Sequence, residues 1–317
     1  MEKQATAGAS GKLRNKHYKK RQTFLRNREF YYMVIPAVVL QFIFHYIPMY
    51  GVTIAFKNVR LGQGYKGPWV GLQQFRRLFN AGQFWSTLKN TLGLNLWVLI
   101  VSVPVPIILA LLLHLCTSKR LKKFSQTATY LPYLCSMVVV VSLLNVFCNG
   151  EFGLINLLRA KNGLPKIPFF GDAKYVYPLY IISAIWQSTG YNAIVYLAAL
   201  TSVNENVLES ARIDGASKWQ QIWHIYLPMI KPTVATMLLL KIGHIMTLSS
   251  TDKILLMQTP LNLSTSETLG TYVYKMGIVN TQYSYSTAVG IFNQICNLII
   301  LLVANKISKK VAETSMF

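Results

Sequence analysis

The side chains most used in catalysis and metal binding are few and scattered in this sequence of 317 residues. It contains ten Asp and Glu, five His and four Cys residues, and neither an H-E-x-x-H nor a G-x-S-x-G motif. The cysteines form no C-x-x-C pair, so we expect neither a disulfide nor a metal site. They are Cys116, Cys135, Cys148 and Cys296. The segment nearest to a phosphate-binding G-x-x-x-x-G-K-[S/T] loop, Gly62 to Gly67, is followed by Pro68 and Trp69. We therefore expect no catalytic centre and no cofactor bound by this chain.

The most regular polar pattern lies in residues 203–232. Asn206 is followed three residues later by Glu, and Ser217 three residues later by Gln, which are two N-terminal capping signals. Gly215 stands between the two predicted helices, where a residue that accepts positive φ can turn the chain. The second helix carries an apolar stripe, and Pro228 and Pro232 are expected to end it. The stripe consists of Trp219, Ile222, Trp223 and Tyr226. The pattern predicts a helix-turn-helix elbow.

Polar and aromatic side chains within the apolar segments are candidates for binding a polar cargo, since such groups are costly in lipid and usually face a pathway or a neighbouring helix. Amides could bind sugar hydroxyls, and aromatic faces could pack on a sugar ring. The candidates are Trp186, Gln187, Tyr191, Asn192, Tyr196, His244 and Asn293, together with Asn95, Asn145 and Gln294. For each residue, helix packing is the alternative role.

Two lysines accompany the fifth apolar segment. Lys241 is compatible with binding an acidic sugar, but snorkelling toward the cytoplasmic interface is the favoured interpretation. Asp252 and Lys253 are expected to mark the outer end of the same helix.

Composition places these residues in a membrane protein. Only 13% of the residues are charged and 52% are hydrophobic, and the hydrophobic ones gather into six segments long enough to cross a bilayer. These segments are residues 31–55, 90–116, 124–148, 177–201, 233–258 and 284–305. The sequence therefore predicts an all-α integral membrane protein with six helices. Prolines inside these segments predict kinks, as transmembrane helices tolerate them. They are Pro36, Pro48, Pro104 and Pro106.

The basic residues set the expected orientation. Lys and Arg exceed Asp and Glu by 22, which in a soluble protein would suggest nucleic-acid binding. Nine of them precede residue 31, however, as in a cytoplasmic tail. With six crossings, both termini and the elbow would then be cytoplasmic. The expected organisation is a basic tail (1–30), a first helix with an extracytoplasmic segment (31–89), a five-helix core (90–306) and a second tail (307–317). The extracytoplasmic segment is expected to lie along the membrane surface.

At the elbow the sequence resembles the permease subunits of binding-protein-dependent ABC importers. Their signature is E-A-A, then Gly four residues later, then I-x-L-P. The matching residues are Glu209, Ser210, Ala211, Gly215, Ile225, Leu227 and Pro228. Ser210 replaces the more common Ala, a change between small residues. The resemblance extends over nearly the whole chain and is closest to permeases for oligosaccharides from complex polysaccharides. Supporting stretches are residues 90–92, 131–133, 186–191 and 271–277.

This resemblance implies a function and partners. The elbow would be the coupling helix that docks on a separate ATPase subunit, through Glu209, Ala211, Asp214 and Gly215. ATP and Mg²⁺ would be used by two such ATPase subunits, and a second homologous permease and an external solute-binding protein would complete the importer. The expected location is the bacterial plasma membrane, in contact with lipid. The chain would carry a carbohydrate by alternating access and would not be an enzyme.

Three alternatives remain open. The first is a permease of the same type for another small solute. The second is an ion-coupled secondary transporter, which should show buried carboxylates or discontinuous helices in related halves. The third is a membrane enzyme acting on lipid-linked sugars, which should show clustered Asp, Glu or His. The sequence indicates none of these features.

Overall fold

The computed structural model describes residues 27–59, 62 and 64–312, and the chain divides into two units, Met1–Ile54 and Ala55–Phe317. All regular elements among the described residues are helices, and the one extended pairing there is an isolated antiparallel bridge between Lys57 and Trp69. The predicted all-α class is therefore confirmed.

The first unit contains one long apolar helical run, from Arg28 into the start of the second unit at Phe56. It passes through α2 (Arg28–Gln41), the π-helical turn η1 (Phe42–Tyr46), α3 (Ile47–Met49) and the 3₁₀ segment η2 (Tyr50–Phe56). Pro36 lies inside α2, and Pro48 lies in the first turn of α3, directly after the π-helical turn η1.

The second unit contains the remaining helices. Its first half comprises α4 (Gln73–Asn80), α5 (Gly82–Ser102), α6 (Pro104–Leu115), α7 (Lys119–Tyr130), η3 (Leu131–Leu134), α8 (Met137–Cys148), α9 (Leu154–Lys161) and η4 (Ala173–Tyr175). Its second half comprises α10 (Val176–Thr201), α11 (Glu205–Ile213), α12 (Lys218–Gln221), η5 (Ile222–Tyr226), α13 (Leu227–Ile242), η6 (Ile245–Thr247), α14 (Thr251–Met257), α15 (Leu263–Ser266), α16 (Leu269–Tyr274), η7 (Lys275–Val279) and α17 (Tyr283–Ala312).

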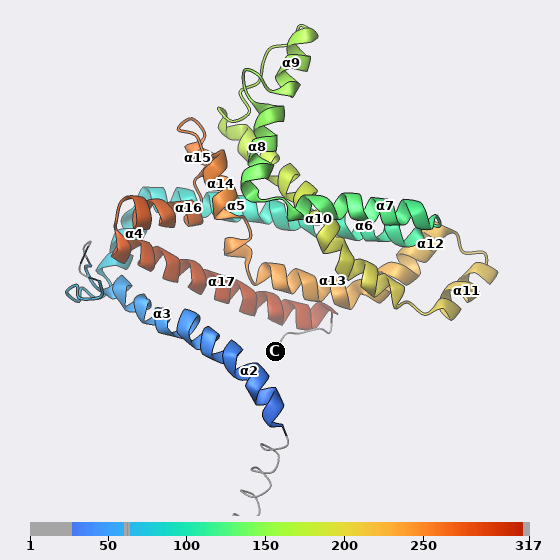
Figure 1. Ribbon diagram of the computed structural model, residues 1–317, viewed down its shortest axis with the longest axis horizontal. Coiled ribbons are helices and arrows are strands. Elements are labelled where there is room, and N and C mark those ends of the chain that lie inside the picture. Colours follow the sequence, from blue (N-terminus) through green and yellow to red (C-terminus); the bar gives the residue numbers. More distant parts are fainter. Residues whose placement is uncertain (1–26, 60–61, 63, 313–317) are drawn as a thin grey trace, which may run out of the picture. The chain divides into compact units, whose positions relative to one another are not determined.

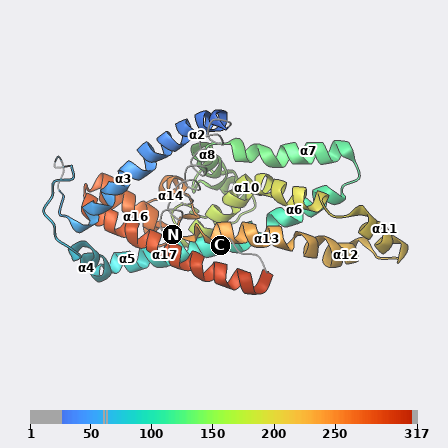
Figure 2. The ribbon, with the colours of Figure 1, turned by 90° about the horizontal axis from the view of Figure 1, so that it is seen from below.

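The long helices of the second unit run lengthwise, with α5 and α6 nearly in line and α17 packed along α13 (Figure 1). The elbow helices α11 and α12 lie at one end of this unit, and α4 and α16 lie at the other, in both views (Figures 1 and 2). Gly190 lets α7 approach α10 closely, because a Cβ there would overlap the backbone carbonyl of Thr129.

Three apolar clusters hold this unit together. One joins α4, α5, η6, α16 and α17 around Phe84. Another joins α5, α8, α10 and α14 around Ile254. The third joins α6, α10, α11, η5 and α13 around Tyr196. Because the elbow shares the third cluster with the long helices, its position is fixed by their packing.

Among the described residues, four helices are long and apolar enough to cross a membrane, and a bent pair could supply a fifth. The four are Arg28–Phe56, Gly82–Leu115, Lys218–Ile242 and Tyr283–Lys309. The predicted fourth segment forms α10, whose 26 residues would span about 39 Å. It is not among the four apolar helices, since its middle carries polar residues such as Gln187 and Asn192.

The prediction of a continuous third helix is wrong. Residues 119–134 and 137–148 form two helical parts that meet at 103°. Cys135 and Ser136 between them have extended backbone, and the Ser136 side chain caps α8 by accepting from the Val139 N–H. Ser136 therefore begins a new helix where the sequence suggested a single apolar run.

The predicted fifth helix is also discontinuous. α13 ends at Ile242, a short 3₁₀ turn follows, and α14 begins only at Thr251. We refer to residues 243–250 as the helix break. A discontinuous helix is one part of the pattern expected for a secondary transporter, the other part being its repetition in a related half of the chain.

Candidate functional site

The first elbow helix, α11, has its N-cap at Asn204, two residues earlier than predicted. The Oδ1 atom of Asn204 accepts a hydrogen bond from the Asn206 N–H at 3.0 Å. Asn204 has the extended backbone of an N-cap, whereas Asn206 lies inside the helix, where its carbonyl accepts from the Ser210 hydroxyl. The prediction of Asn206 as the cap is therefore wrong, although the helix itself is confirmed.

Gly215 makes the turn of the elbow, as predicted, with φ of 80°. Its N–H donates to the Arg212 carbonyl, and the Ala216 N–H donates to the Ala211 carbonyl at 2.9 Å. This is the Schellman arrangement, in which the residue after the helix adopts the left-handed conformation that glycine tolerates best. Ser217 and Gln220 then form the predicted capping box of α12.

The second elbow helix does not end at Pro228 or Pro232, contrary to the prediction. Residues Lys218–Ile242 form one helix of 25 residues. Pro228 lies in the first turn of α13, immediately after the π-helical turn η5, which loosens the preceding hydrogen-bond ladder. The elbow is consequently a rigid extension of the long helix.

The elbow presents both charged and apolar side chains to its surroundings. Glu209, Ser210, Asp214 and Gly215 are exposed, and Ala211 is half-buried. Neither carboxylate forms an ion pair within the described part of the chain. The predicted apolar stripe is divided, since Tyr226 is buried while Trp219 and Trp223 are exposed and meet edge to face. Ile225 and Leu227 are half-buried, and Pro228 is exposed.

A cavity of about 540 Å³ lies among α5, η3, α10, α13, the helix break and α14. One face of α10 lines it, because residues three to four positions apart lie on the same side of a helix. These residues are Tyr180, Ala184, Gln187, Ser188 and Asn192. Tyr133, Ser136 and Ser250 contribute further hydroxyl groups. Such a mixed polar and apolar lining suits a hydroxyl-rich ligand.

Three of the predicted pathway residues lie at or beside this cavity. Gln187 and Asn192 line it, and Gln187 also donates to the Cys135 carbonyl at 3.0 Å, at the bend of the third segment. Tyr191 stacks on Tyr133, a lining residue, with ring centroids 4.0 Å apart and nearly parallel planes.

The other four predicted pathway residues lie elsewhere. Trp186 is on another face of α10, in a small apolar pocket with Val140 and Phe147. Tyr196 is buried in the third apolar cluster. His244 is exposed at the end of α13, and Asn293 is buried in α17.

Side chains from three helices satisfy the backbone of the helix break. Asn297 of α17 accepts from the Met246 N–H and donates to the Gly243 carbonyl. Asn95 of α5 accepts from the Ser249 N–H at 2.9 Å, and the Tyr180 hydroxyl accepts from the Ser250 N–H. Non-helical backbone within a membrane protein requires such partners. Asn95, a predicted pathway candidate, thus supports the break, and Asn297 was missed by the sequence analysis.

Both lysines of the fifth segment line the cavity. The Lys241 side chain does not snorkel to a helix end. Its ammonium group donates hydrogen bonds to the carbonyl and the hydroxyl of Ser102 in α5. Lys253 does not mark an exposed helix end, since only 1% of it is exposed. Its Nζ lies 4.7 Å from the centre of the Tyr180 ring and has no hydrogen-bond partner among the described residues. A desolvated cation–π contact is worth about 2 kcal/mol, whereas burying an ion costs several kcal/mol.

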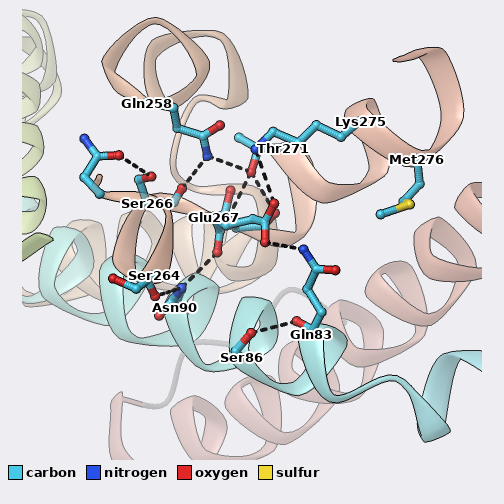
Figure 3. A network of polar contacts seen from close by, with 12 residues as sticks. Gln83, Ser86, Asn90, Gln258, Ser264, Ser266, Glu267, Thr271, Lys275 and Met276 are labelled. Carbon is cyan, nitrogen blue, oxygen red and sulfur yellow. Dashed lines mark hydrogen bonds and ion pairs between the residues drawn. The ribbon is translucent and has the colours of Figure 1, made fainter. Parts of the chain in front are cut away.

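At the end opposite the elbow, a polar network joins α5 to the segment around α15 and α16 (Figure 3). The Glu267 carboxylate accepts from Gln83 of α5 and pairs with Lys275 at 3.2 Å. Asn90 donates to the backbone carbonyls of Ser264 and Glu267. The network fixes the segment around α15 and α16 on α5. The carboxylate in this network, Glu267, is already paired with Lys275.

A second loop at the surface carries an ion pair between Asp172 and Lys174, at 2.9 Å. The hydrogen bond from Lys174 lowers the pKa of the Asp172 carboxyl and raises the pKa of the Lys174 ammonium. Within residues 27–59, 62 and 64–312, no three His, Cys, Asp or Glu side chains are grouped so that they could hold a metal ion.

The fold agrees with a comparison of the chain with known proteins. Residues 86–313 match the family described as the inner membrane component of binding-protein-dependent transport systems. The chain belongs to this family, which confirms the class inferred from Glu209, Gly215 and the residues around them.

Particular relatives cover almost the whole chain. The polygalacturonan/rhamnogalacturonan transport system permease protein YteP of Bacillus subtilis (strain 168) is 40% identical over 294 residues, covering 92% of this chain and 91% of the relative. A crystal structure of a bacterial ABC transporter involved in import of the acidic polysaccharide alginate contains a chain with a TM-score of 0.85 and 37% identity, at 92% and 98% coverage. A second structure, of the alginate transporter with its alginate pentasaccharide-bound periplasmic protein, matches with a TM-score of 0.85 and 36% identity, at 93% and 99% coverage.

Proposed function

We propose that this chain is the permease subunit through which an ABC importer moves an oligosaccharide across the bacterial plasma membrane. Its membership of the transport family carries this proposal, and the exposed, doubly capped elbow is the structural feature that supports it. The transport class follows from the family, and the names of the relatives supply the carbohydrate class of the cargo.

The elbow is the proposed contact with a cytoplasmic ATPase subunit. Its exposed Glu209 and Asp214 are available to basic groups of a partner, and Trp219 and Trp223 offer apolar area beside them. Two ATPase subunits would bind ATP and Mg²⁺, and a second permease would complete the membrane part. Closure of the ATPases would displace the elbow and, with it, the long helix that begins at Lys218.

The cavity beside α10 is the proposed part of the cargo pathway. Gln187 and Asn192 provide amides for sugar hydroxyls, and Tyr133 and Tyr191 provide aromatic rings at its edge. The structure gives no such support to Trp186, which lines a separate apolar pocket.

The proposed topology has six crossings, with both termini and the elbow in the cytoplasm. Four apolar helices, the bent third segment and α10 would be the six. The surplus of basic residues before residue 31 supports this orientation. An external solute-binding protein would then dock on the outer segments, which include residues 56–89 and 259–283.

Transport by the reconstituted importer tests this proposal. We expect vesicles that contain both permeases and the ATPase subunits to accumulate oligosaccharides only with ATP and the binding protein. ADP in place of ATP is the control. Accumulation by vesicles that lack the ATPase subunits and are driven by an ion gradient would contradict the proposal and favour a secondary transporter.

A further inference from the structure

The cavity beside α10 has a one-sided charge. Lys241 and Lys253 both line it, and no Asp or Glu is among its lining residues. A cavity whose only ionic groups are cations attracts anions and disfavours cations.

The two lysines differ in how their charge is accommodated. The Lys241 ammonium donates to the carbonyl and the hydroxyl of Ser102, at 3.1 and 2.9 Å. The Lys253 ammonium contacts the face of Tyr180 and has no hydrogen-bond partner among the described residues. Since a buried ammonium group normally has an anionic or hydrogen-bonding partner, Lys253 retains unused capacity to bind an anion.

The nearby carboxylates do not fill this role. Asp252 is the neighbour of Lys253 in α14, but it is exposed while Lys253 is buried, as expected for adjacent residues about 100° apart on a helix. Glu267, next to α16, is paired with Lys275 and accepts from Gln83. Within the described part of the chain, Lys253 therefore has no carboxylate partner, and its position is open to a carboxylate supplied by a ligand.

We propose that Lys253 binds a carboxylate group of the cargo, so that this permease selects oligosaccharides that contain uronic acids. A carboxylate in the cavity would accept charge-assisted hydrogen bonds from Lys253, while Lys241 adds to the positive potential. Tyr133 and the amides of Gln187 and Asn192 line the same cavity and would contact the neutral parts of the sugar. This inference rests on the proposed function, because it assigns a specificity residue to the same pathway.

Uptake by the complete importer in vesicles tests the assignment. The probes are trigalacturonate, trimannuronate, the uncharged methyl ester of each, and maltotriose. We expect the wild type to prefer an acidic trisaccharide over its ester, and Lys253→Met to lower this preference roughly tenfold or more, as for loss of a hydrogen bond to a charged group. The binding protein is the same for every variant, so its own selectivity cancels when ratios are compared.

Two further variants separate charge from packing. Lys253→Arg keeps the positive charge and is expected to retain the preference for the acid, and Lys161→Met removes an exposed lysine of α9 and should leave the wild-type ratio unchanged. Assembly and basal ATPase activity are measured for each variant. If the Met and Arg variants lose uptake of all probes equally, Lys253 acts in packing and the inference is overturned.

The outcomes distinguish the inference from the function on which it rests. An unchanged acid-to-ester ratio in Lys253→Met, or a wild type that carries the esters or maltotriose as well as the acids, overturns the inference alone. A wild type that shows no ATP-dependent uptake of any of the five probes overturns the proposed oligosaccharide function as well.

Discussion

Asn297 shows how one side chain can stabilise an interruption in a helix. It satisfies both the Gly243 carbonyl and the Met246 N–H at the helix break. We expect Asn297→Leu to destabilise the protein by about 2 kcal/mol or more, because two buried backbone groups lose their partner. Thermal unfolding in detergent measures the change.

Asn162→Leu is the matched control, because Asn162 is exposed and bonds only within its own surface turn. Its effect should remain within about 0.5 kcal/mol. Equal stability of the two variants would show that Asn297 is not required at the break.

Gln187 and Asn192 offer a second test at single residues. We expect Leu at both positions to lower oligosaccharide uptake roughly thirtyfold, since each lost hydrogen bond contributes about 1 kcal/mol. The ATPase subunits should remain bound, because neither residue lies on the elbow. Uptake assays and copurification provide the two measurements.

Asn192→Leu alone separates cargo binding from packing, because Gln187 also bonds to the Cys135 carbonyl. Trp186→Phe is the control from another face of α10, and its uptake should match that of the wild type. Normal uptake by the double variant would remove these amides from the pathway.

The sequence located polar residues in the membrane but could not assign their partners. Asn95 and Gln187 are both amides in apolar segments, yet one supports the helix break and the other both braces a bend and lines the cavity. The role of each amide depends on which backbone carbonyls and N–H groups lack a helical hydrogen-bond partner at breaks in other helices. Because those breaks arise from tertiary packing, the sequence pattern does not reveal them.

At the scale of elements, the elbow is the segment that the sequence predicted best. Caps and turns are local, so Ser217, Gln220 and Gly215 could be assigned from their spacing alone. The end of α12 was predicted wrongly, because a π-helical turn lets Pro228 and Pro232 lie within a continuous helix. Hydropathy also failed to predict the interruptions of the third and fifth segments. It averages over a window of residues, and the residues before and after each interruption are equally apolar.

Gly215 tests the elbow as an element. Valine at φ of 80° would be strained by about 1–2 kcal/mol or more, so we expect Gly215→Val to distort the turn between α11 and α12. Uptake per ATP hydrolysed should fall severalfold, while the protein remains inserted in the membrane. Parallel assays of uptake and ATP hydrolysis give this ratio.

Gly163→Val is the control, because Gly163 also has positive φ, at 70°, and a Cβ added there would meet no atom within 4 Å. It lies in the loop after α9, so the same strain should leave coupling intact. Equal effects of the two substitutions would mean that the elbow has no special part in energy transfer.

For the whole molecule, composition and the resemblance at the elbow were enough to predict the class, and the family match confirms it. The positions of Lys241 and Lys253 in one cavity could not be predicted, because they depend on how α5, α10 and the helix break meet. The apolar pattern of residues 233–258 alone places Lys253 near the outer end of one continuous helix.

The proposed orientation leads to a labelling experiment. In a background with the four native cysteines replaced by alanine, we expect an impermeant maleimide added outside the cell to label Asn162→Cys but not Ser210→Cys. Both positions are exposed, so the difference would report the side of the membrane. Permeabilised cells, in which both should react, are the control, and the reverse pattern would invert the topology.

The uninterrupted run from Lys218 to Ile242 has a mechanical consequence. It is one helix about 37 Å long, so a displacement of its Lys218 end is passed along the helix toward Ile242, through the π-helical turn η5. Beyond that point the axial hydrogen bonds stop, and Lys253 belongs to a separate short helix. In the proposed orientation, the half of this segment nearer the cytoplasm can therefore swing while α14, which carries Lys253, stays seated against Tyr180.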